Sequence, residues 1–461
     1  DVSNLKLKIT PEEKDHTVMD DVLDVSVRML MMVRNVSLNY RHGEILNLQG
    51  FMPNTGFFGQ NGSAPGYDFT FGFFKTDEYL NKTYAKEWML QDTNVVNPII
   101  HTVTQDFQIK TQLSPFSGLK IDLNGAWAKS KSTEIYYMFD GRPETYGGTY
   151  TRTHMALKTA FRSPALNSET FNDFLKNRKI IQGRVRRDFM NKMENEGLPY
   201  DPGRVYVNEN SGDVLIPAFL SAYSGTSASS ADLDLLPNIL SILPNWKVTY
   251  DGLSRLPFIR DHFKSVNLNH GYKCTYNLNS FASQTNWTPI VSNYGYSISE
   301  DYSDFDVVTG EDYVGSVNMN EAFNPLFGFD ASLKNSLSFK AEFRKSRTAQ
   351  LDVPGNQIVE SYSNEYVFGT GYRIDDFGMI INLNNNKQKK VKNDLNLRVD
   401  LSWKNTDAYI RVIEDEYSQL SSGLKSFIIK FSAEYVFSEM LNIRFYYDRT
   451  ASTPKVSQGY P

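Results

Sequence analysis

Apolar and polar side chains alternate strictly along many stretches of this chain, and this alternation constrains the fold more than any other feature. Residues 396–404 and 427–438 each place their apolar members on one parity and their polar members on the other. A period of two is typical of a β-strand with one apolar and one polar face. Strands of about 9–11 residues with this pattern suit a membrane-spanning β-barrel, whose outside contacts lipid and whose inside contacts water. The residues predicted to face lipid are Leu397, Val399, Leu401, Trp403, Phe427, Ile429, Phe431, Tyr435 and Phe437.

The opposite parity of the same strands carries polar side chains of both charge signs. The residues predicted to face the lumen of a barrel are Asn396, Arg398, Asp400, Lys430, Glu434 and Arg444. A water-filled lumen needs a polar wall and no catalytic group. We expect a wall of mixed charge to bind no single cargo tightly.

The composition narrows the class of protein further. With 461 residues, of which 40% are hydrophobic, the chain is long enough for one large core or for two to three ordinary domains. No apolar run approaches the ~20 residues of a membrane helix, so this chain could cross a membrane only as strands. The net charge of −5 gives no reason to expect nucleic acid as a partner. The single cysteine, Cys274, excludes an intrachain disulfide and a thiolate metal cluster.

No group of residues in the sequence indicates catalysis, a cofactor or a metal. The six histidines are scattered without a metal-binding pair. Asp301, Asp304 and Asp306 lack the spacing and the glycine of a helix-loop-helix calcium site. Gly369-x-Gly371 lacks the third glycine and the following helix of a nucleotide-binding loop. We therefore predict that the protein is not an enzyme.

Residues 1–162 are predicted to form barrel strands interrupted by one loop at residues 50–69. Five glycines and two prolines exclude a regular element through this loop, and its five aromatic residues make a free linker improbable. We predict a loop that folds back onto the body of the protein. Its candidate functional residues are Phe51, Met52, Pro53, Phe57, Phe58, Pro65 and Tyr67.

At residues 163–244 the apolar residues no longer recur with a period of two. We predict an insertion on the extracellular side there, with one helix at about residues 170–195. Apolar side chains recur there at helical spacing, Thr170 and Asp173 resemble a capping box, and Gly197 and Pro199 end the helix. The other face of the helix is basic, and it either remains solvated or contacts anionic lipid or an acidic partner. Its residues are Lys176, Lys179, Arg184, Arg186, Arg187 and Lys192.

Residues 245–461 are predicted to be barrel strands again, which gives about 14 to 18 strands in the whole chain. Their connections alternate in length, and outer-membrane barrels have short periplasmic turns and long external loops. Short connections are expected near residues 330–335, 374–376, 404–406 and 438–440, and long ones near 301–312, 349–357, 384–390 and 415–423. Residues 457–461 have turn chemistry, so we expect that at least one closing strand is missing and that the chain is a fragment.

Motifs spread over about residues 20–460 carry a family resemblance. They include Gly50-Phe51-Met52-Pro53, Phe58-Gly59-Gln60, Ala64-Pro65-Gly66-Tyr67-Asp68-Phe69, Asp213-Val214-Leu215-Ile216-Pro217-Ala218-Phe219, Asn245-Trp246-Lys247-Val248-Thr249-Tyr250, Phe343-Arg344-Lys345-Ser346-Arg347-Thr348 and Phe445-Tyr446-Tyr447-Asp448-Arg449. Together, and in this order, they resemble the SprA/Sov family. This family is the outer-membrane translocon of the type IX secretion system of Bacteroidota, and the chain resembles its C-terminal part.

The resemblance implies a fold, a function and partners. The fold would be the C-terminal arc of a very large single-chain antiparallel transmembrane β-barrel, a class in which the largest members reach about 36 strands. The function would be to pass folded cargo proteins with C-terminal sorting domains through a wide pore that opens sideways. The partners would be the remainder of the same barrel, a PorV-like barrel at the lateral opening, a periplasmic plug protein, secreted cargo and outer-membrane lipid. The loop at residues 50–69 would then fold into the lumen or line the gate, or else be merely structural.

Two other classes of protein also have alternating strands. A TonB-dependent receptor or a porin would need a complete, even-numbered barrel. A soluble all-β adhesin would bury its apolar faces between two sheets and would have shorter strands. A structure that shows what covers the apolar faces separates these classes.

Overall fold

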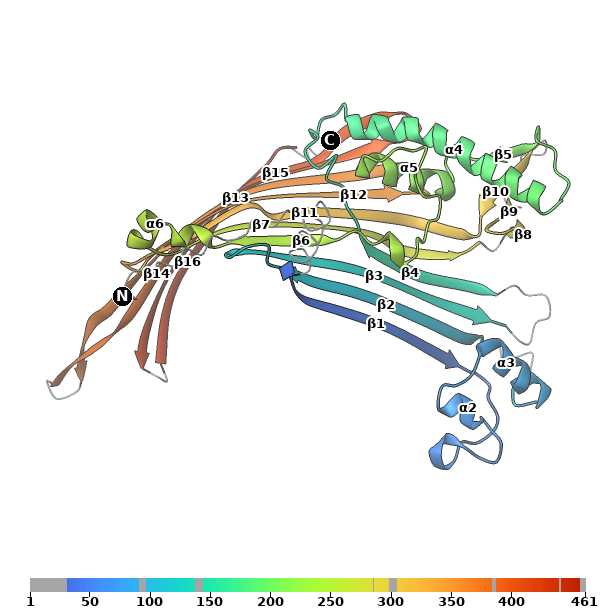
Figure 1. The fold of residues 1–461 in the computed structure, drawn as a ribbon, viewed down its shortest axis with the longest axis horizontal. Helices are drawn as coiled ribbons and strands as arrows, with labels where there is room; N and C mark the ends of the chain where they lie inside the picture. Colours follow the sequence, from blue (N-terminus) through green and yellow to red (C-terminus); the bar gives the residue numbers. More distant parts are fainter. Residues whose placement is uncertain are drawn as a thin grey trace, which may run out of the picture.

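The computed structural model shows a protein built mainly of β-strands, with one large antiparallel sheet and few helices. It describes residues 31–90, 97–136, 144–284, 286–297, 305–383, 387–438 and 441–456. The large sheet is a long, curved arc whose strands run side by side along the length of the molecule (Figure 1). The turn expected at residues 457–461 lies outside the described residues.

Twelve strands form the large sheet, in the order β1-β2-β3-β4-β7-β11-β12-β13-β14-β15-β16, with β6 paired to both β3 and β7. Their bounds are β1 Val33–Asn47, β2 Ile99–Leu113, β3 Leu119–Ile135, β4 Thr145–Thr153, β6 Asn245–Tyr250, β7 Phe263–Ser283, β11 Asp312–Leu333, β12 Leu337–Asp352, β13 Gln357–Leu383, β14 Lys387–Val412, β15 Tyr417–Ser438 and β16 Leu441–Pro454. A second sheet joins four short strands, β5 Val205–Val207, β10 Asp306–Gly310, β9 Tyr294–Ser297 and β8 Trp287–Val291. Within the described residues, β1 pairs only with β2 and β16 only with β15, so the arc has two open edges.

Several strands are much longer than the 9–11 residues expected from the sequence. β13 has 27 residues and β14 has 26, so both pass through segments predicted to be turns. At residues 374–376, β13 contains a register shift and Asp376 has a positive φ of 56°, which marks a β-bulge. Residues 404–406 lie inside β14 and pair with β13. The predictions of turns at these two places were wrong because a bulge and a polar stretch within a strand use the same residue types as a turn.

The prediction of a long connection near residues 384–390 is also wrong. β13 ends at Leu383, β14 begins at Lys387, and Lys387 to Lys390 pair with Leu383 to Ile380. A polar, lysine-rich segment is therefore part of a ladder. The connections expected to be long near residues 349–357 and 415–423 are short as well, since only residues 353–356 separate β12 from β13 and only residues 413–416 separate β14 from β15, so connection length does not alternate in this part of the sheet.

Strands β4 and β6 share one position in the sheet. β4 pairs with Trp127–Glu134 of β3, β6 pairs with Leu119–Asn124 of the same strand, and both also pair with β7. The chain therefore leaves the sheet halfway along a strand position, after Thr153, and returns at Asn245 to complete it. The sequence pattern predicts one strand over residues 150–161, but β4 ends at this break. The segment between, residues 154–244, is called the insertion below.

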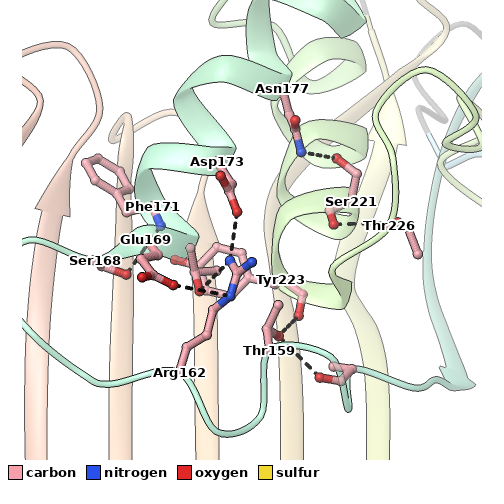
Figure 2. A network of polar contacts seen from close by, with 12 residues as sticks. Thr159, Arg162, Ser168, Glu169, Phe171, Asp173, Asn177, Ser221, Tyr223 and Thr226 are labelled. Carbon is pink, nitrogen blue, oxygen red and sulfur yellow. Dashed lines mark hydrogen bonds and ion pairs between the residues drawn. The ribbon is translucent and has the colours of Figure 1, made fainter.

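The insertion packs on one face of the sheet and contains two of the described helices. Helices α4 (Glu169–Asn195) and α5 (Gly212–Ser224) run over the strands from β11 to β15 (Figure 1). The helix expected at about residues 170–195 corresponds to α4, but its N-cap is Ser168, whose side chain accepts a hydrogen bond from the Phe171 N–H. Asp173, expected in a capping box, instead forms an ion pair with Arg162 at 2.7 Å (Figure 2).

The prediction of a single helical segment was wrong, because the structure contains several. Besides α4 and α5, the structure has α2 (Tyr67–Thr70), α3 (Thr76–Ala85) and α6 (Pro257–His262), and 3₁₀ turns at Phe57–Gly59, Ile239–Ser241 and Gly252–Arg255. α5 is apolar on all sides and contains Pro217, so it lacks the amphipathic period by which helices are predicted. None of the described helices is both long enough and apolar enough to span a membrane.

Candidate functional site

One face of the large sheet carries a continuous band of exposed apolar side chains. The pairing register places all of its members on the same face as Leu401, and Phe368 and Trp403 are 57% and 55% exposed. We call this band the apolar belt; it consists of Phe339, Phe343, Tyr366, Phe368, Tyr372, Leu397, Val399, Leu401, Trp403, Phe427, Ile429 and Phe431. Five of these side chains line a shallow groove of about 480 Å³. No described sheet or helix covers the belt, which distinguishes it from the buried faces of a β-sandwich.

A row of aromatic side chains borders the belt on the side of the insertion. We call it the aromatic row; it consists of Trp246, Tyr272, Phe323, Phe327, Phe343, Tyr366, Trp403 and Phe427, from β6, β7, β11, β12, β13, β14 and β15. Two groups of rings within the row are in contact: Trp246, Tyr272 and Phe323, with centroids 4.5 and 5.0 Å apart, and Phe343, Tyr366 and Trp403, with centroids 4.7 and 6.0 Å apart. Aromatic girdles of this kind mark the membrane interfaces of outer-membrane barrels.

The strand face that carries the belt is apolar over a length that fits the apolar part of an outer membrane. On β15 this parity stays apolar beyond the belt member Phe431 and ends at Phe437, ten residues after Phe427. At about 3.3 Å per residue this distance is about 33 Å along the strand, and a tilt of about 40° projects it to about 25 Å. Of the residues predicted to face lipid, Tyr435 alone is fully buried, because its hydroxyl donates to the Phe377 carbonyl and its ring packs on Phe377 and Phe437.

The opposite face of the same strands is polar and is crossed by ion pairs. All six residues predicted to face a lumen share this face, since Asn396, Arg398 and Asp400 pair with Glu434, Ser432 and Lys430, and Glu434 pairs with Arg444. Arg398 lies 2.7 Å from Asp400, Lys340 lies 2.8 Å from Glu342, and Ser402 donates to Glu365 at 2.7 Å. Positive and negative side chains therefore neutralise one another along this face.

Beyond the aromatic row, the face of the sheet that carries the belt bears buried charged side chains. Two arginine–glutamate pairs lie there, Arg347 with Glu321 at 2.9 Å and Arg411 with Glu360 at 2.6 Å, and all four side chains are at most 2% exposed. Charges in such positions need a full set of partners, because burial removes their hydration. The insertion supplies these partners.

The insertion makes direct polar contacts with both buried pairs. Arg411 donates to the carbonyl oxygens of Ala165 at 3.1 Å and Leu166 at 3.2 Å, and Tyr223 of α5 donates its hydroxyl to Glu360. Arg347 donates to the hydroxyl and carbonyl oxygens of Thr159, which also donates to the Tyr223 carbonyl (Figure 2). The insertion and the sheet therefore complete each other's hydrogen bonding.

The basic face of α4 is divided between internal and exposed residues. Arg184 donates to the carbonyls of Ala228 and Ala231, and Arg186 donates to those of Val205 and Pro202. Lys192 lies 3.1 Å from Asp188 and donates to the Ser292 carbonyl at 3.3 Å. Three exposed cations remain on this face, Lys176, Lys179 and Arg187. Helical periodicity could not separate these two groups, because both lie away from the core-facing residues.

The loop at residues 50–69 lies beyond the end of β1, where it folds together with α3 into a small lobe (Figure 1). Phe51 packs edge-on against Trp88, and the buried Pro65 carbonyl accepts a hydrogen bond from Tyr79. The Gln60 amide closes the loop by bonding both the N–H and the carbonyl of Gly66. The loop is thus folded back, as predicted, but onto its own lobe at a strand end.

The seven candidate residues of this loop fall into two groups. Phe51 and Pro53 are partly buried and Pro65 is buried, so their role in the lobe is structural. The other four are exposed: Met52, Phe57, Phe58 and Tyr67. Phe57 and Phe58 form the tip, where their rings pack together at 4.4 Å and Phe58 adopts a positive φ of 53°. An exposed aromatic tip on a fixed lobe suits contact with a partner.

His154 gives the docking of the insertion a dependence on pH. It follows the strand break, is buried, and its Nε2 lies 2.6 Å from the Ser224 hydroxyl of α5. Burial lowers the pKa of His154 from 6.5 to about 3, so the docked ring is neutral whereas an undocked ring takes up a proton below pH 6.5. Because the undocked state then binds more protons, docking is at full strength above pH 6.5 and weakens by about 1.4 kcal/mol per pH unit as the pH falls toward 3.

We therefore expect the insertion to become more sensitive to protease as the pH is lowered from 6.5 to about 5. His154→Gln removes the titrating group and should remove most of this change. A full acid response in H154Q would show that other groups cause it.

Among the described residues, no three or more His, Cys, Asp or Glu side chains are placed to hold a metal ion. Asp301 and Asp304 lie outside the described residues. Cys274 is buried. No known family model matches the chain, and no curated protein is similar to it.

Proposed function

We propose that this chain is an arc of a large outer-membrane β-barrel of the SprA/Sov type, which conducts folded proteins across the outer membrane of a Gram-negative bacterium of the Bacteroidota. In this arrangement the apolar belt contacts lipid, and the ion-paired face lines a water-filled pore. The observation that carries the proposal is the uncovered belt, which lies on a strand face that is apolar over about 25 Å, is bordered by the aromatic row and is backed by a charged face.

The two open edges of the arc support a barrel wall that contains more strands than this chain supplies. An unpaired edge strand exposes backbone groups that a membrane cannot hydrate, so β1 and β16 need further strands. The remainder of the barrel is the partner proposed for both edges. A PorV-like barrel, a periplasmic plug protein and secreted cargo complete the proposed set of partners.

Two experiments test this proposal. The first is fractionation, in which the protein should remain in the outer membrane after carbonate washing and enter solution only with detergent. The second is removal of the gene, after which proteins with C-terminal sorting domains should accumulate in the periplasm. Release of the protein by carbonate, or normal export in its absence, would overturn the proposal.

The aromatic tip of the residue 50–69 lobe gives a sharper test of the gate. We expect Phe57→Ser combined with Phe58→Ser to reduce cargo export strongly, since the tip is the exposed part of the lobe that has no internal structural task. Both side chains are exposed, so barrel assembly should be unchanged. The control is Asn81→Ser, an exposed residue on α3 of the same lobe.

Deletion of residues 53–65 should reduce cargo export as the double substitution does. The deletion also removes the hydrogen bonds between Gln60 and Gly66. Normal export by both variants, with the barrel assembled, would leave the lobe with a structural role only.

A further inference from the structure

The insertion meets the aromatic row along an exposed apolar edge. Phe161 packs on Phe323 of the row, with ring centroids 5.3 Å apart, and is nevertheless 59% exposed. Leu243 donates its N–H to the Thr153 carbonyl at the strand break and is also exposed, and Leu240, three residues before it, is 88% exposed. Leu243 lies three residues before Trp246, with which the aromatic row begins. The edge is therefore continuous with the border of the apolar belt.

Two lysines lie along the same line. Lys345 and Lys425 are each two residues from an aromatic-row member, Phe343 and Phe427, on the same face and on the side of the insertion. The Lys345 ammonium lies 4.8 Å from the ring centroid of Phe161, and Lys425 is exposed. Aromatic rings with lysines just outside them are the side chains that proteins place at the boundary between acyl chains and lipid headgroups.

The insertion lies on the same face of the sheet as the belt. Arg411, which contacts the insertion, and Trp403 of the belt have the same parity on β14, and no register shift with β13 separates them. They are eight residues apart, about 26 Å along the strand. If the belt is in lipid, the insertion is therefore on the outward side of the wall, directly above the membrane surface.

We propose that this edge of the insertion is seated in the headgroup region of the bilayer. Phe161, Leu240 and Leu243 reach the acyl boundary, and Lys345 and Lys425 bind anionic lipid headgroups. The inference rests on the proposed membrane location of the belt. It gives the insertion a second support besides its hydrogen bonds to the buried ion pairs of the sheet, because the insertion is then held by the sheet and by the lipid beneath it.

Cysteine labelling can test this seat, because the chain's only cysteine, Cys274, is buried and will not compete for the label. Three single variants of the complete protein carry a fluorescent label at Leu401→Cys in the belt, Leu240→Cys at the edge, and Lys179→Cys on the exposed face of α4. Each is reconstituted in vesicles of phosphatidylcholine and phosphatidylglycerol that contain a quencher either near the headgroup or deep in the acyl chains. Leu240 is chosen because its replacement leaves the contact between Phe161 and Phe323 intact.

We expect the label at position 401 to lose most of its fluorescence to the deep quencher, the label at 240 to the headgroup quencher, and the label at 179 to neither. If the label at position 401 is quenched and the label at position 240 is not, the edge of the insertion does not lie in the headgroup region. The membrane location of the belt is then still supported. If 401 is not quenched, the proposed function itself fails. A label at 240 that is shielded from lipid and from aqueous quenchers would mean that a protein covers the edge, which also overturns the seat.

A second measurement tests the proposed contact of Lys345 and Lys425 with anionic lipid. Lys345→Gln combined with Lys425→Gln should weaken the headgroup quenching at position 240 and leave the deep quenching at position 401 unchanged. Equal headgroup quenching with and without the two lysines would overturn their contact with anionic lipid.

Discussion

Replacement of Arg411 by alanine is expected to undock the insertion, at a cost of about 3–5 kcal/mol. Arg411 is fully buried between β14 and the insertion, where it pairs with Glu360 and donates to Ser418 and to the carbonyls of Ala165 and Leu166. Its removal leaves a buried carboxylate without its cation and two carbonyls without a donor. The expected result is rapid protease cleavage within residues 162–168 while the sheet remains folded.

Two further variants separate this effect from a general loss of stability. Arg398→Ala removes another arginine of β14 that forms an ion pair, with Asp400 of the same strand, but Arg398 is 61% exposed, so its loss should cost about 0–1 kcal/mol. The triple variant Arg411→Met, Glu360→Leu, Tyr223→Phe removes both charges and the hydroxyl that donates to Glu360, and should recover most of the docking. Continued undocking in the triple variant would show that the single variant loses packing at Arg411 and the hydrogen bonds to the Ala165 and Leu166 carbonyls, rather than the partner of a buried charge.

The faces of the strands could be predicted from the sequence because each depends only on local alternation. Along β14, the apolar residues Leu397 to Trp403 and the charged residues between them lie on opposite faces whatever surrounds the strand. The same rule fails at Arg411, which shares the parity of Trp403. Alternation would place this charge in lipid, and the carbonyls that accept its hydrogen bonds lie about 245 residues earlier in the chain.

The broken strand position was invisible in the sequence for a related reason. Residues 145–153 and 245–250 each form a short alternating segment, and nothing in either one indicates that together they fill one position between β3 and β7. Prediction therefore placed the insertion at a strand end, where loops usually lie. In the structure the insertion instead begins and ends in the middle of the wall, which is why it covers a face of the sheet.

A charge placed in the apolar belt should prevent the protein from assembling in a membrane. Leu401 lies near the middle of the belt, between Phe368 and Ile429 on the neighbouring strands. An arginine at the midplane of a barrel's lipid face costs about 2–4 kcal/mol, which is a large part of the stability of an ordinary domain. We expect Leu401→Arg to abolish folding into lipid vesicles and to remove the protein from the outer-membrane fraction.

The neighbouring residue provides the matched control. Ser402 lies on the polar face and donates to Glu365, so an arginine there meets water and a carboxylate. Ser402→Arg should therefore fold and insert as the unchanged protein does. The two substitutions add the same side chain at adjacent positions, so only the face of the sheet differs between them. Equal tolerance of both would mean that the belt does not contact lipid, and equal failure would mean that the polar face is as tightly enclosed as the apolar one. Failure of Leu401→Arg alone is the outcome that a wall with lipid on one side and water on the other requires.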